Sequence, residues 1–403
     1  MSIFSRLDVT FRGLSSIARN FLFGISFFTI VAMSQQAAQA SVVTLIGGGD
    51  NHTCAALAEG GLKCWGSGSF GQIGDGAKLS RSTPVAVPAL AGFKIMAVAG
   101  GTYFSCALTS TGAIYCWGHN AYGQLGNGTY VDSATPVAVH LPTGPAVGLI
   151  AGRQFACLLD TFGNVYCWGQ NNFGQLNRSV KAIGGSNVPI YSAGENNIVA
   201  LAGNGMGTCF LDKTGGDKCF GVNQQGQKGI GVKDATAGAT YGTPSYVTGL
   251  STGVVSISAS MYDGCAVTTL HALYCWGENT AFGQFGFSGT GYYLTPLAIS
   301  GTRSDVKAVY ARDYHTCITT VGGAAQCWGN NTYGQVGRGT PSNNATPGDV
   351  LTLSEGVISL SLGYGHSCAL LKGGTVKCWG LNNLSQLGNG STTNSILPLA
   401  VPL

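Results

Sequence analysis

The sequence predicts an all-β protein, a seven-bladed β-propeller, and three observations carry this prediction. Pairs of cysteines with nine residues between them recur seven times and account for all 14 cysteines. The first cysteines of successive pairs lie 52, 51, 52, 56, 52 and 51 residues apart, and a period near fifty residues indicates a repeat architecture. Glycine makes up 64 of 403 residues, about twice the usual share, which suits many short strands joined by tight turns.

Residues 1–40 have the pattern of a secretory signal peptide. Three arginines precede an apolar stretch at 21–33, and residues 38–40 read Ala-Gln-Ala, a small-x-small cleavage signature. We expect cleavage after Ala40 and a mature domain of residues 41–403. The apolar stretch is short for a bilayer, so an N-terminal membrane anchor is the less favoured alternative, and we expect no stable membrane span after cleavage. The expected location is secreted, periplasmic or at the cell surface.

The mature chain carries little charge, which narrows the classes of partner. Only 9% of the residues are charged, and loss of residues 1–40 leaves a net charge of +2. This charge gives little attraction to nucleic acid or to an anionic membrane, so we expect no nucleic-acid partner. Secretion and an even number of paired cysteines agree on an oxidising compartment. Zinc is the competing interpretation of the cysteines, but zinc sites favour two to four intervening residues, so we expect no metal.

Each cysteine pair fits a β-hairpin. In the second repeat, a three-residue loop at 110–112 places the two cysteines opposite each other, and Gly112 supplies the left-handed residue that such a loop needs. Directly opposed cysteines on neighbouring strands are within disulfide range. We therefore predict one disulfide in each repeat: Cys54–Cys64, Cys106–Cys116, Cys157–Cys167, Cys209–Cys219, Cys265–Cys275, Cys317–Cys327 and Cys368–Cys378.

Two further strand candidates precede each hairpin. Before Cys106 they are Thr83–Val87 and Lys94–Ala99, which makes a unit of four short antiparallel strands, the anatomy of a propeller blade. The first repeat has no counterpart of the earlier strand, whereas the chain ends with a spare one, Leu397–Val401. We expect this C-terminal strand to complete the first blade and so to close the ring.

The repeat resembles a known family. The core pattern V-x-x-x-A-G-x-x-x-x-C-A-L and the following W-G-x-N-x-x-G-Q-L-G are similar to the regulator of chromosome condensation (RCC1-type) repeat, and the similarity covers residues 41–403. The resemblance implies a seven-bladed propeller, and a cysteine pair in each hairpin is similar to secreted, bacterial-type members. Nuclear members exchange guanine nucleotide on a small GTPase; the leader and the near-neutral charge make this activity a less favoured expectation here.

No catalytic constellation is recognisable, and we expect no enzyme activity and no cofactor. The cysteines are committed to disulfides, and no glycine-rich stretch is followed by the Lys-Ser/Thr of a phosphate loop. Three histidines, His52, His315 and His366, recur two residues before a first cysteine. A turn-stabilising role is favoured for them over a ring of metal ligands.

The variable turns before the first cysteines are the candidate binding surface. Equivalent turns emerge on one face of a propeller, and tyrosine and arginine are enriched at interfaces. The candidate partner-binding residues are Tyr103, Phe104, Arg153, Tyr262, Arg312, Tyr314 and Tyr364. The leading hypothesis is a monomeric, exported, non-enzymatic scaffold that binds a protein or glycan; the runner-up is a protein inhibitor of a secreted or periplasmic enzyme.

The fourth repeat departs from the pattern. Phe220 replaces the tryptophan, Gln225 the aromatic residue before Gly-Gln, and Lys228 the apolar residue after it. Long inserts at 178–197 and 233–241 flank this repeat. Long loops on a rigid scaffold often carry function, but decay of one blade explains the same changes.

Overall fold

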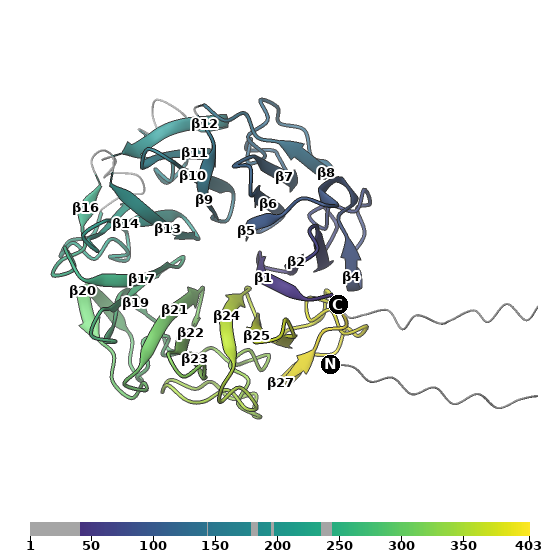
Figure 1. The fold of residues 1–403 in the computed structure, drawn as a ribbon. Helices are drawn as coiled ribbons and strands as arrows, with labels where there is room; N and C mark the ends of the chain where they lie inside the picture. The colour runs from purple at the N-terminus through teal and green to yellow at the C-terminus, as the bar shows by residue number, and fades with distance from the viewer. Residues whose placement is uncertain (1–40, 143, 179–183, 195–196, 235–243) are drawn as a thin grey trace, which may run out of the picture. The chain divides into compact units, whose positions relative to one another are not determined.

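Seven small antiparallel sheets are arranged in a ring in a computed structural model that describes residues 41–142, 144–178, 184–194, 197–234 and 244–403 (Figure 1). This confirms the predicted seven-bladed β-propeller. No helix among these residues is long and apolar enough to cross a bilayer. The predicted leader, residues 1–40, lies outside the described residues, and cleavage after Ala40 remains a prediction.

Each blade is formed by strands that follow one another in the chain: an inner strand, the two strands of the cysteine hairpin and an outer strand. The first three blades contain β1 (Val43–Gly48), β2 (His52–Leu57), β3 (Leu62–Gly66) and β4 (Arg81–Ala86); β5 (Ile95–Gly100), β6 (Phe104–Thr109), β7 (Ile114–Gly118) and β8 (Ser133–Ala138); and β9 (Ala146–Ala151), β10 (Phe155–Asp160), β11 (Asn164–Gln170) and β12 (Gly185–Gly194). A single turn of 3-10 helix, η1 (Pro88–Leu90), links blade 1 to blade 2.

The remaining four blades repeat this order. They contain β13 (Ile198–Asn204), β14 (Gly207–Asp212), β15 (Asp217–Gly221) and β16 (Ser245–Tyr246); β17 (Val254–Ala259), β18 (Asp263–Thr268), β19 (Leu273–Asn279) and β20 (Gly291–Ala298); β21 (Val306–Arg312), β22 (His315–Thr320) and β23 (Ala325–Gly329); and β24 (Val357–Leu362), β25 (His366–Leu371), β26 (Val376–Gly380) and β27 (Ser395–Ala400).

The outer edge of blade 6 is less regular than the others. Its fourth segment pairs with β23 through the isolated bridges Gln326–Asp349 and Gly329–Asn344 and not as a regular strand. Gly348 lies opposite Cys327 there, at the place that Val85 occupies opposite Cys64 in blade 1. Glycine has no side chain to pack on the sheet and weakens a strand, which accounts for the shortened pairing.

The C-terminal strand does not complete the first blade, so the predicted mode of ring closure is wrong. Strand β27 pairs with β26, with Cys378 opposite Leu399, and belongs to blade 7. Blade 1 already has its outer strand, β4, which follows its own hairpin and pairs with β3. The outer strand therefore comes after the hairpin of its own blade. The Trp-Gly turn and the Gly-Gln loop reverse the chain, so that each outer strand folds back onto the hairpin that it follows.

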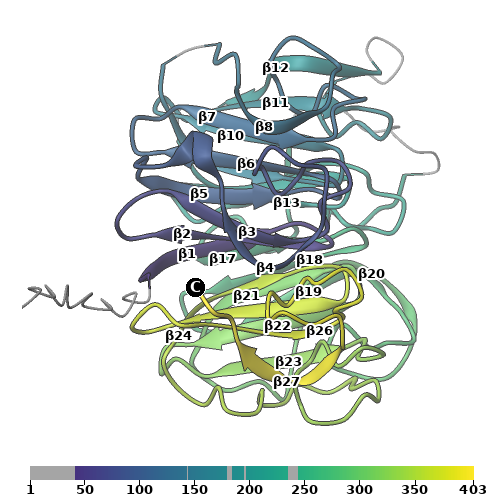
Figure 2. The ribbon, with the colours of Figure 1, turned by 90° about the vertical axis from the view of Figure 1, so that its right-hand side faces the viewer.

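The ring closes by packing of blade 7 against blade 1, whose strands lie side by side in Figures 1 and 2. The indole N–H of Trp65 in blade 1 donates to the Gln386 carbonyl in the last loop at 3.0 Å. In the same loop, the N–H of Gly390 donates to the Ser82 carbonyl of β4 at 2.8 Å. The first and last blades thus meet through the contacts that join other neighbouring blades.

All seven predicted disulfides are confirmed. In every hairpin the two cysteines are directly opposed across the ladder, with Cα atoms 4.0–4.1 Å apart. The turn glycine has the expected left-handed conformation, with φ of 80° at Gly112. In the fifth blade His271 takes this place with φ of 61°, and its Nδ1 lies 2.9 Å from the Val306 carbonyl oxygen, an interaction that helps to hold it there.

A repeated hydrogen bond joins neighbouring blades. The tryptophan after the second cysteine is fully buried and donates its indole N–H, at 2.8–3.0 Å, to the glutamine carbonyl in the Gly-Gln loop of the preceding blade. The pairs are Trp65–Gln386, Trp117–Gln72, Trp168–Gln124, Trp276–Gln227, Trp328–Gln284 and Trp379–Gln335. Blade 4 carries Phe220 instead, which fills the same core position but has no donor.

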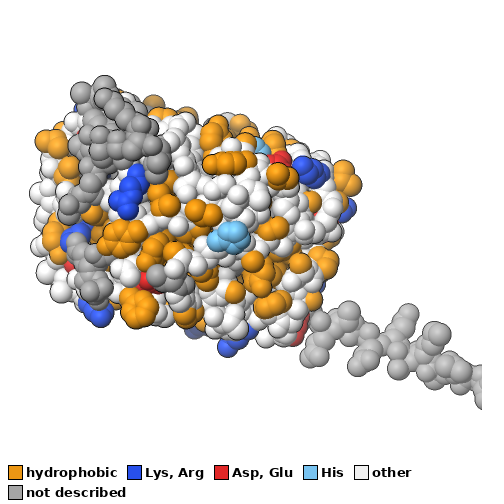
Figure 3. Space-filling model, turned by 90° about the horizontal axis from the view of Figure 1, so that it is seen from above, with side chains coloured by type: hydrophobic (Ala, Val, Ile, Leu, Met, Phe, Trp, Pro, Cys, Tyr) orange, Lys and Arg blue, Asp and Glu red, His pale blue; other side chains and the backbone are white. Residues whose placement is uncertain are grey.

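The surface agrees with the low charge of the sequence. In the view of Figure 3, Lys, Arg, Asp and Glu side chains are few and widely spaced, and apolar side chains lie scattered among neutral polar surface. Scattered apolar residues are normal for a protein surface.

We expect the loss in free energy of unfolding on removal of the indole donor to depend on whether another group also donates to the glutamine carbonyl. The Gln72 carbonyl also accepts from the Ser105 hydroxyl at 2.8 Å, whereas Trp168 is the only side chain among the described residues that donates to the Gln124 carbonyl. Trp168→Phe leaves a buried acceptor unpaired and should lower the free energy of unfolding by about 1–2 kcal/mol more than Trp117→Phe. Denaturant unfolding of both variants measures this difference, and equal losses would contradict it.

Candidate partner-binding face

The turns between the inner strand and the hairpin all lie at one end of the ring, and backbone hydrogen bonds join the turns of blades 7, 1, 2, 3 and 4. We call this end the turn face; it comprises residues 49–51, 101–103, 152–154, 205–206, 260–262, 312–314 and 363–365 together with the adjoining Gly-Gln loops. Bonds of 2.9–3.4 Å run from one turn to the next: Asp50 N–H to Gly101, Thr102 N–H to Arg153, Arg153 N–H to Gly205, and Tyr364 N–H to Asp50. In blades 5 and 6 the carbonyls of Tyr262 and Tyr314 accept from the backbone N–H groups of Glu278 and Asn330 in the same blade, both at 2.9 Å. Together these bonds hold the turns as a rigid rim.

Aromatic side chains gather on the turn face, and three of the four candidate tyrosines lie in these groups. The rings of Tyr262 and Tyr314, from blades 5 and 6, are stacked with centroids 5.1 Å apart. Phe282, from the Gly-Gln loop of blade 5, lies 5.3 Å from Tyr314. Tyr103 of blade 2 lies 4.7 Å from Phe70 of the blade 1 loop. Each aromatic group therefore spans the junction of two blades.

Tyr364 and Arg153 are accessible from the same face. The side chain of Tyr364 is 47% exposed, and Arg153 is half-buried. The structure thus places five of the seven candidate partner-binding residues, all except Phe104 and Arg312, within reach of a partner.

Phe104 and Arg312 are buried beneath the turn face, so they are not part of the candidate partner-binding surface. Phe104 is fully buried in the core that blades 2 and 3 share. Arg312 is also buried, and its guanidinium forms an ion pair with Asp50 of blade 1 at 2.6 Å. The sequence could not show this, because Asp50 lies 262 residues away in the chain.

The ion pair sets the electrostatics at the centre of the face. Burial opposes ionisation of Asp50, but the charge and hydrogen bond of Arg312 outweigh it and hold the pKa of Asp50 below its ordinary value. Asp313, with a left-handed backbone, is next to Arg312. Burial, and then the nearby charge of Asp50, raise the pKa of Asp313 to about 6. The centre of the face therefore holds the Arg312–Asp50 ion pair and, next to it, the carboxyl group of Asp313, whose pKa is about 6.

The three recurrent histidines link blades. The Nε2 atom of each lies within 3.1 Å of a hydroxyl in the next blade, and the pairs are His52–Ser105, His315–Ser367 and His366–Thr53. Two of these hydroxyls, on Ser105 and Ser367, donate in turn to the glutamine carbonyl that receives the tryptophan. The predicted turn-stabilising role is therefore more specific: the histidines extend the hydrogen bonding between blades 6, 7, 1 and 2.

Burial of these histidines should make the fold sensitive to acid. Burial and the charge of Arg312 lower the pKa of His52 to about 4, and the pKa of His315 and His366 to about 3. The unfolded chain binds these protons near pH 6.5 and the folded chain does not, so stability is full above pH 6.5 and declines as the pH falls toward 4. In blades 2 and 3 the position of these histidines, two residues before the first cysteine, is occupied by Phe104 and Phe155.

We therefore expect His52→Phe to reduce the loss of melting temperature between pH 7 and pH 4.5, and a variant with all three histidines replaced by phenylalanine to reduce it further. Thermal melting across this range makes the measurement. Parallel melting curves for wild type and the triple variant would rule out the histidines as the source of acid sensitivity.

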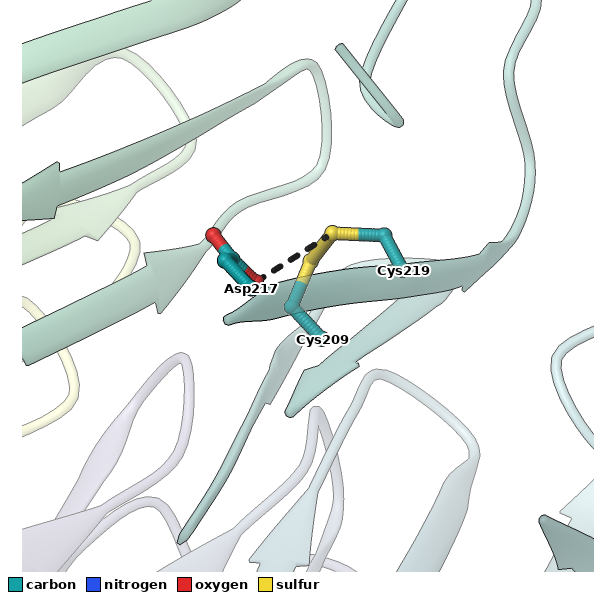
Figure 4. A group of neighbouring side chains, drawn as sticks. All are labelled: Cys209, Asp217 and Cys219. Atoms are coloured by element: carbon teal, nitrogen blue, oxygen red, sulfur yellow. Dashed lines mark hydrogen bonds between the residues drawn. A yellow bond between two sulfur atoms is a disulfide. The ribbon is translucent and has the colours of Figure 1, made fainter. Parts of the chain in front are cut away.

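Blade 4 contains a buried carboxyl group beside its disulfide (Figure 4). The potential ligand atoms of Cys209, Asp217 and Cys219 all lie within 4.8 Å of one another, but the two cysteines are joined to each other, which leaves no thiolate for a metal. Asp217 takes the core position that Leu62 and Leu273 occupy in other blades. Burial raises the pKa of Asp217 to about 8, so the group is largely protonated at neutral pH.

Asp217 should destabilise the fold as the pH rises. The unfolded carboxyl releases its proton near pH 4 and the folded one near pH 8, so its penalty is absent below pH 4 and grows up to about pH 8. We expect Asp217→Leu to melt at a higher temperature than wild type at pH 8, by a margin clearly greater than at pH 5.5. A margin that stays constant with pH would show that the carboxyl does not titrate in this window.

The other departures of blade 4 are also internal. Phe220 and Lys228 are both buried, and burial lowers the pKa of Lys228. Gln225 is half-buried in the Gly-Gln loop. Of the two predicted inserts, residues 179–183, 195–196 and 235–243 lie outside the described residues, so a functional role for these inserts stays a prediction.

Sequence and structure comparisons identify proteins that are similar to this chain. The chain is 28% identical over 386 residues to the Arabidopsis thaliana ultraviolet-B receptor UVR8, which covers 91% of this chain and 83% of the receptor. It is 26% identical to the human E3 ubiquitin-protein ligase HERC2, over 86% of this chain but only 6% of the ligase. Yeast RCC1 (Prp20), solved bound to Kap60, superimposes with a TM-score of 0.74 at 22% identity, covering 94% of this chain and 91% of the yeast protein.

The repeats themselves match a family signature. Two models of the regulator of chromosome condensation (RCC1) repeat match segments that together cover residues 43–175 and 306–386. These segments exceed half of the chain and leave out the region of blades 4 and 5, which includes the divergent fourth repeat. The chain belongs to the regulator of chromosome condensation (RCC1) repeat family.

Proposed function

We propose that this protein is an exported, non-enzymatic scaffold that binds a protein or glycan partner through its turn face. The observation that carries the proposal is the concentration of accessible tyrosines from blades 2, 5, 6 and 7 on turns that backbone hydrogen bonds hold in place. Tyrosine gives a large contact area at low entropic cost, and a rigid rim spares a partner the cost of ordering it.

The relatives support a binding role. The yeast propeller is described in complex with Kap60 and by its binding properties to Gsp1p and histones, so the architecture serves as a protein-binding scaffold in at least one member. Export is supported by the leader pattern of residues 1–40 and by seven disulfides, which persist in oxidising compartments. Weak net charge and the leader argue against a nuclear exchange-factor role.

The experiment compares two sets of substitutions at opposite ends of the ring. The face variant carries Ala at Tyr103, Arg153, Tyr262, Tyr314 and Tyr364. The control variant carries Ser at Phe162, Leu270 and Val321, three exposed residues in the hairpin turns at the other end. Both should stay folded and elute as monomers, because none of the replaced side chains is buried. The control should melt like wild type, whereas the face variant should melt at a modestly lower temperature because it loses the ring contacts of Tyr103, Tyr262 and Tyr314.

Each protein is then used as bait for the culture medium and cell-surface fraction of the source organism. We expect the control to retain the wild-type partner and the face variant to lose it by at least tenfold. Retention by the face variant and loss by the control would place the binding surface at the hairpin-turn end and overturn the proposal. Stoichiometric capture of one enzyme, with loss of its activity, would identify the scaffold as an inhibitor.

A further inference from the structure

We propose that a cleft beside Arg153 on the turn face binds the carboxylate-bearing ring of an acidic sugar, a hexuronate. The inference rests on the proposed function, because it names the chemistry of one partner subsite on the same face. The cleft has a volume of about 270 Å³ and is lined by turn residues of blades 2, 3 and 4 and by the loop that follows β11. Its lining side chains include Tyr103, Arg153, Gln154, Gln170, Phe173 and Met206.

The guanidinium of Arg153 has unused hydrogen-bonding capacity. Among the described residues, its one hydrogen-bond partner is the Met261 sulfur, at 3.2 Å, and a thioether is a weak acceptor. The guanidinium carries five N–H donors in a fork that matches a carboxylate. The nearby Asp50 is already paired with Arg312, and Asp313 contributes a second negative charge close by. A ligand carboxylate can therefore bind the unused N–H donors of Arg153, and the carboxylate of Asp313 competes with it for them.

The backbone keeps this donor in place. The Arg153 N–H donates to the Gly205 carbonyl, and the Arg153 carbonyl accepts from the Thr102 N–H, both at 3.0 Å. The side chain reaches across the turn of blade 4 to blade 5. A side chain at Gly205, which has φ of 60°, would place its Cβ 2.4 Å from the Met261 Cα atom. Gly205 thus lets the turn of blade 4 lie directly against Met261 of blade 5, the residue whose sulfur accepts from Arg153.

The remaining lining residues fit a sugar ring. Tyr103 and Phe173 offer aromatic faces on which the apolar C–H face of a pyranose can pack, and Tyr103 is steadied by Phe70 at 4.7 Å. Gln154 and Gln170 carry amide groups that both donate and accept hydrogen bonds, as ring hydroxyls require. A compact cleft with a few convergent polar groups suits a small ring better than an extended peptide, which pairs with an open strand edge or a long groove.

The test uses the mature chain, residues 41–403, and charged and neutral forms of the same oligosaccharide. The probes are oligogalacturonate, oligoglucuronate and oligomannuronate, each with its fully methyl-esterified counterpart, which keeps the ring and hydroxyls but removes the charge. Polyglutamate serves as an acidic peptide. Calorimetric titration measures binding to wild type, to Arg153→Gln, and to Arg338→Gln, a matched loss of one surface arginine, whose side chain bonds the Thr346 carbonyl in a loop of blade 6.

We expect at least one acidic oligosaccharide to bind wild type and Arg338→Gln equally, and to bind Arg153→Gln at least tenfold more weakly. The methyl ester of that oligosaccharide should bind wild type at least tenfold more weakly than the acid form does. The proposal is overturned if no acidic oligosaccharide binds, if ester and acid bind alike, if Arg153→Gln binds like wild type, or if polyglutamate binds more tightly than the sugars. If the sugar proposal fails but the proposed function is right, Arg153→Gln should still capture the partner in the bait experiment. The two failures can therefore be distinguished.

Discussion

The hydrogen bond from a buried tryptophan to the glutamine carbonyl of the preceding blade is the constraint on which the ring depends. A propeller blade is a small sheet that cannot bury both faces alone, and it is stable only when its neighbours cover it. The indole fills the space between two blades, and its N–H fixes their relative position through a group that has no water to bond instead. Because the same contact joins Trp65 of blade 1 to Gln386 of the last loop, closure needs no strand shared between the ends.

This constraint also explains why the turn face is a suitable place for recognition. The tryptophan–glutamine hydrogen bonds and the disulfides hold the hairpins in place. Each hairpin then fixes the loop that leads into it on the turn face. The histidines of blades 1, 6 and 7 and the ion pair of Arg312 with Asp50 add bonds beneath the same surface. The residues of the proposed partner-binding surface therefore rest on a layer of buried, hydrogen-bonded groups.

Blade 4 is the place where the pattern is relaxed. It lacks the indole donor at residue 220, contains the uncompensated carboxyl of Asp217 in its core, and has glycine and methionine in its turn. The first two changes cost stability, and the disulfide of the blade remains to limit that cost. The third lets the turn of blade 4 lie directly against Met261 of blade 5. A blade that departs from its repeat at both core and turn is consistent with relaxed packing beside the proposed cleft.

The sequence by itself determined the number of blades, the family and all seven disulfide pairings. Each of these depends on residues within one hairpin or on a period that is counted directly, and a hairpin of eleven residues leaves the cysteines one way to pair. Tertiary structure decided which hairpin each outer strand joins, because a periodic pattern reads the same in either phase and only the strand pairing distinguishes them. It also decided which candidate residues reach the surface. Phe104 and Arg312 have the residue types of a binding site, but strand register and a partner 262 residues distant bury them.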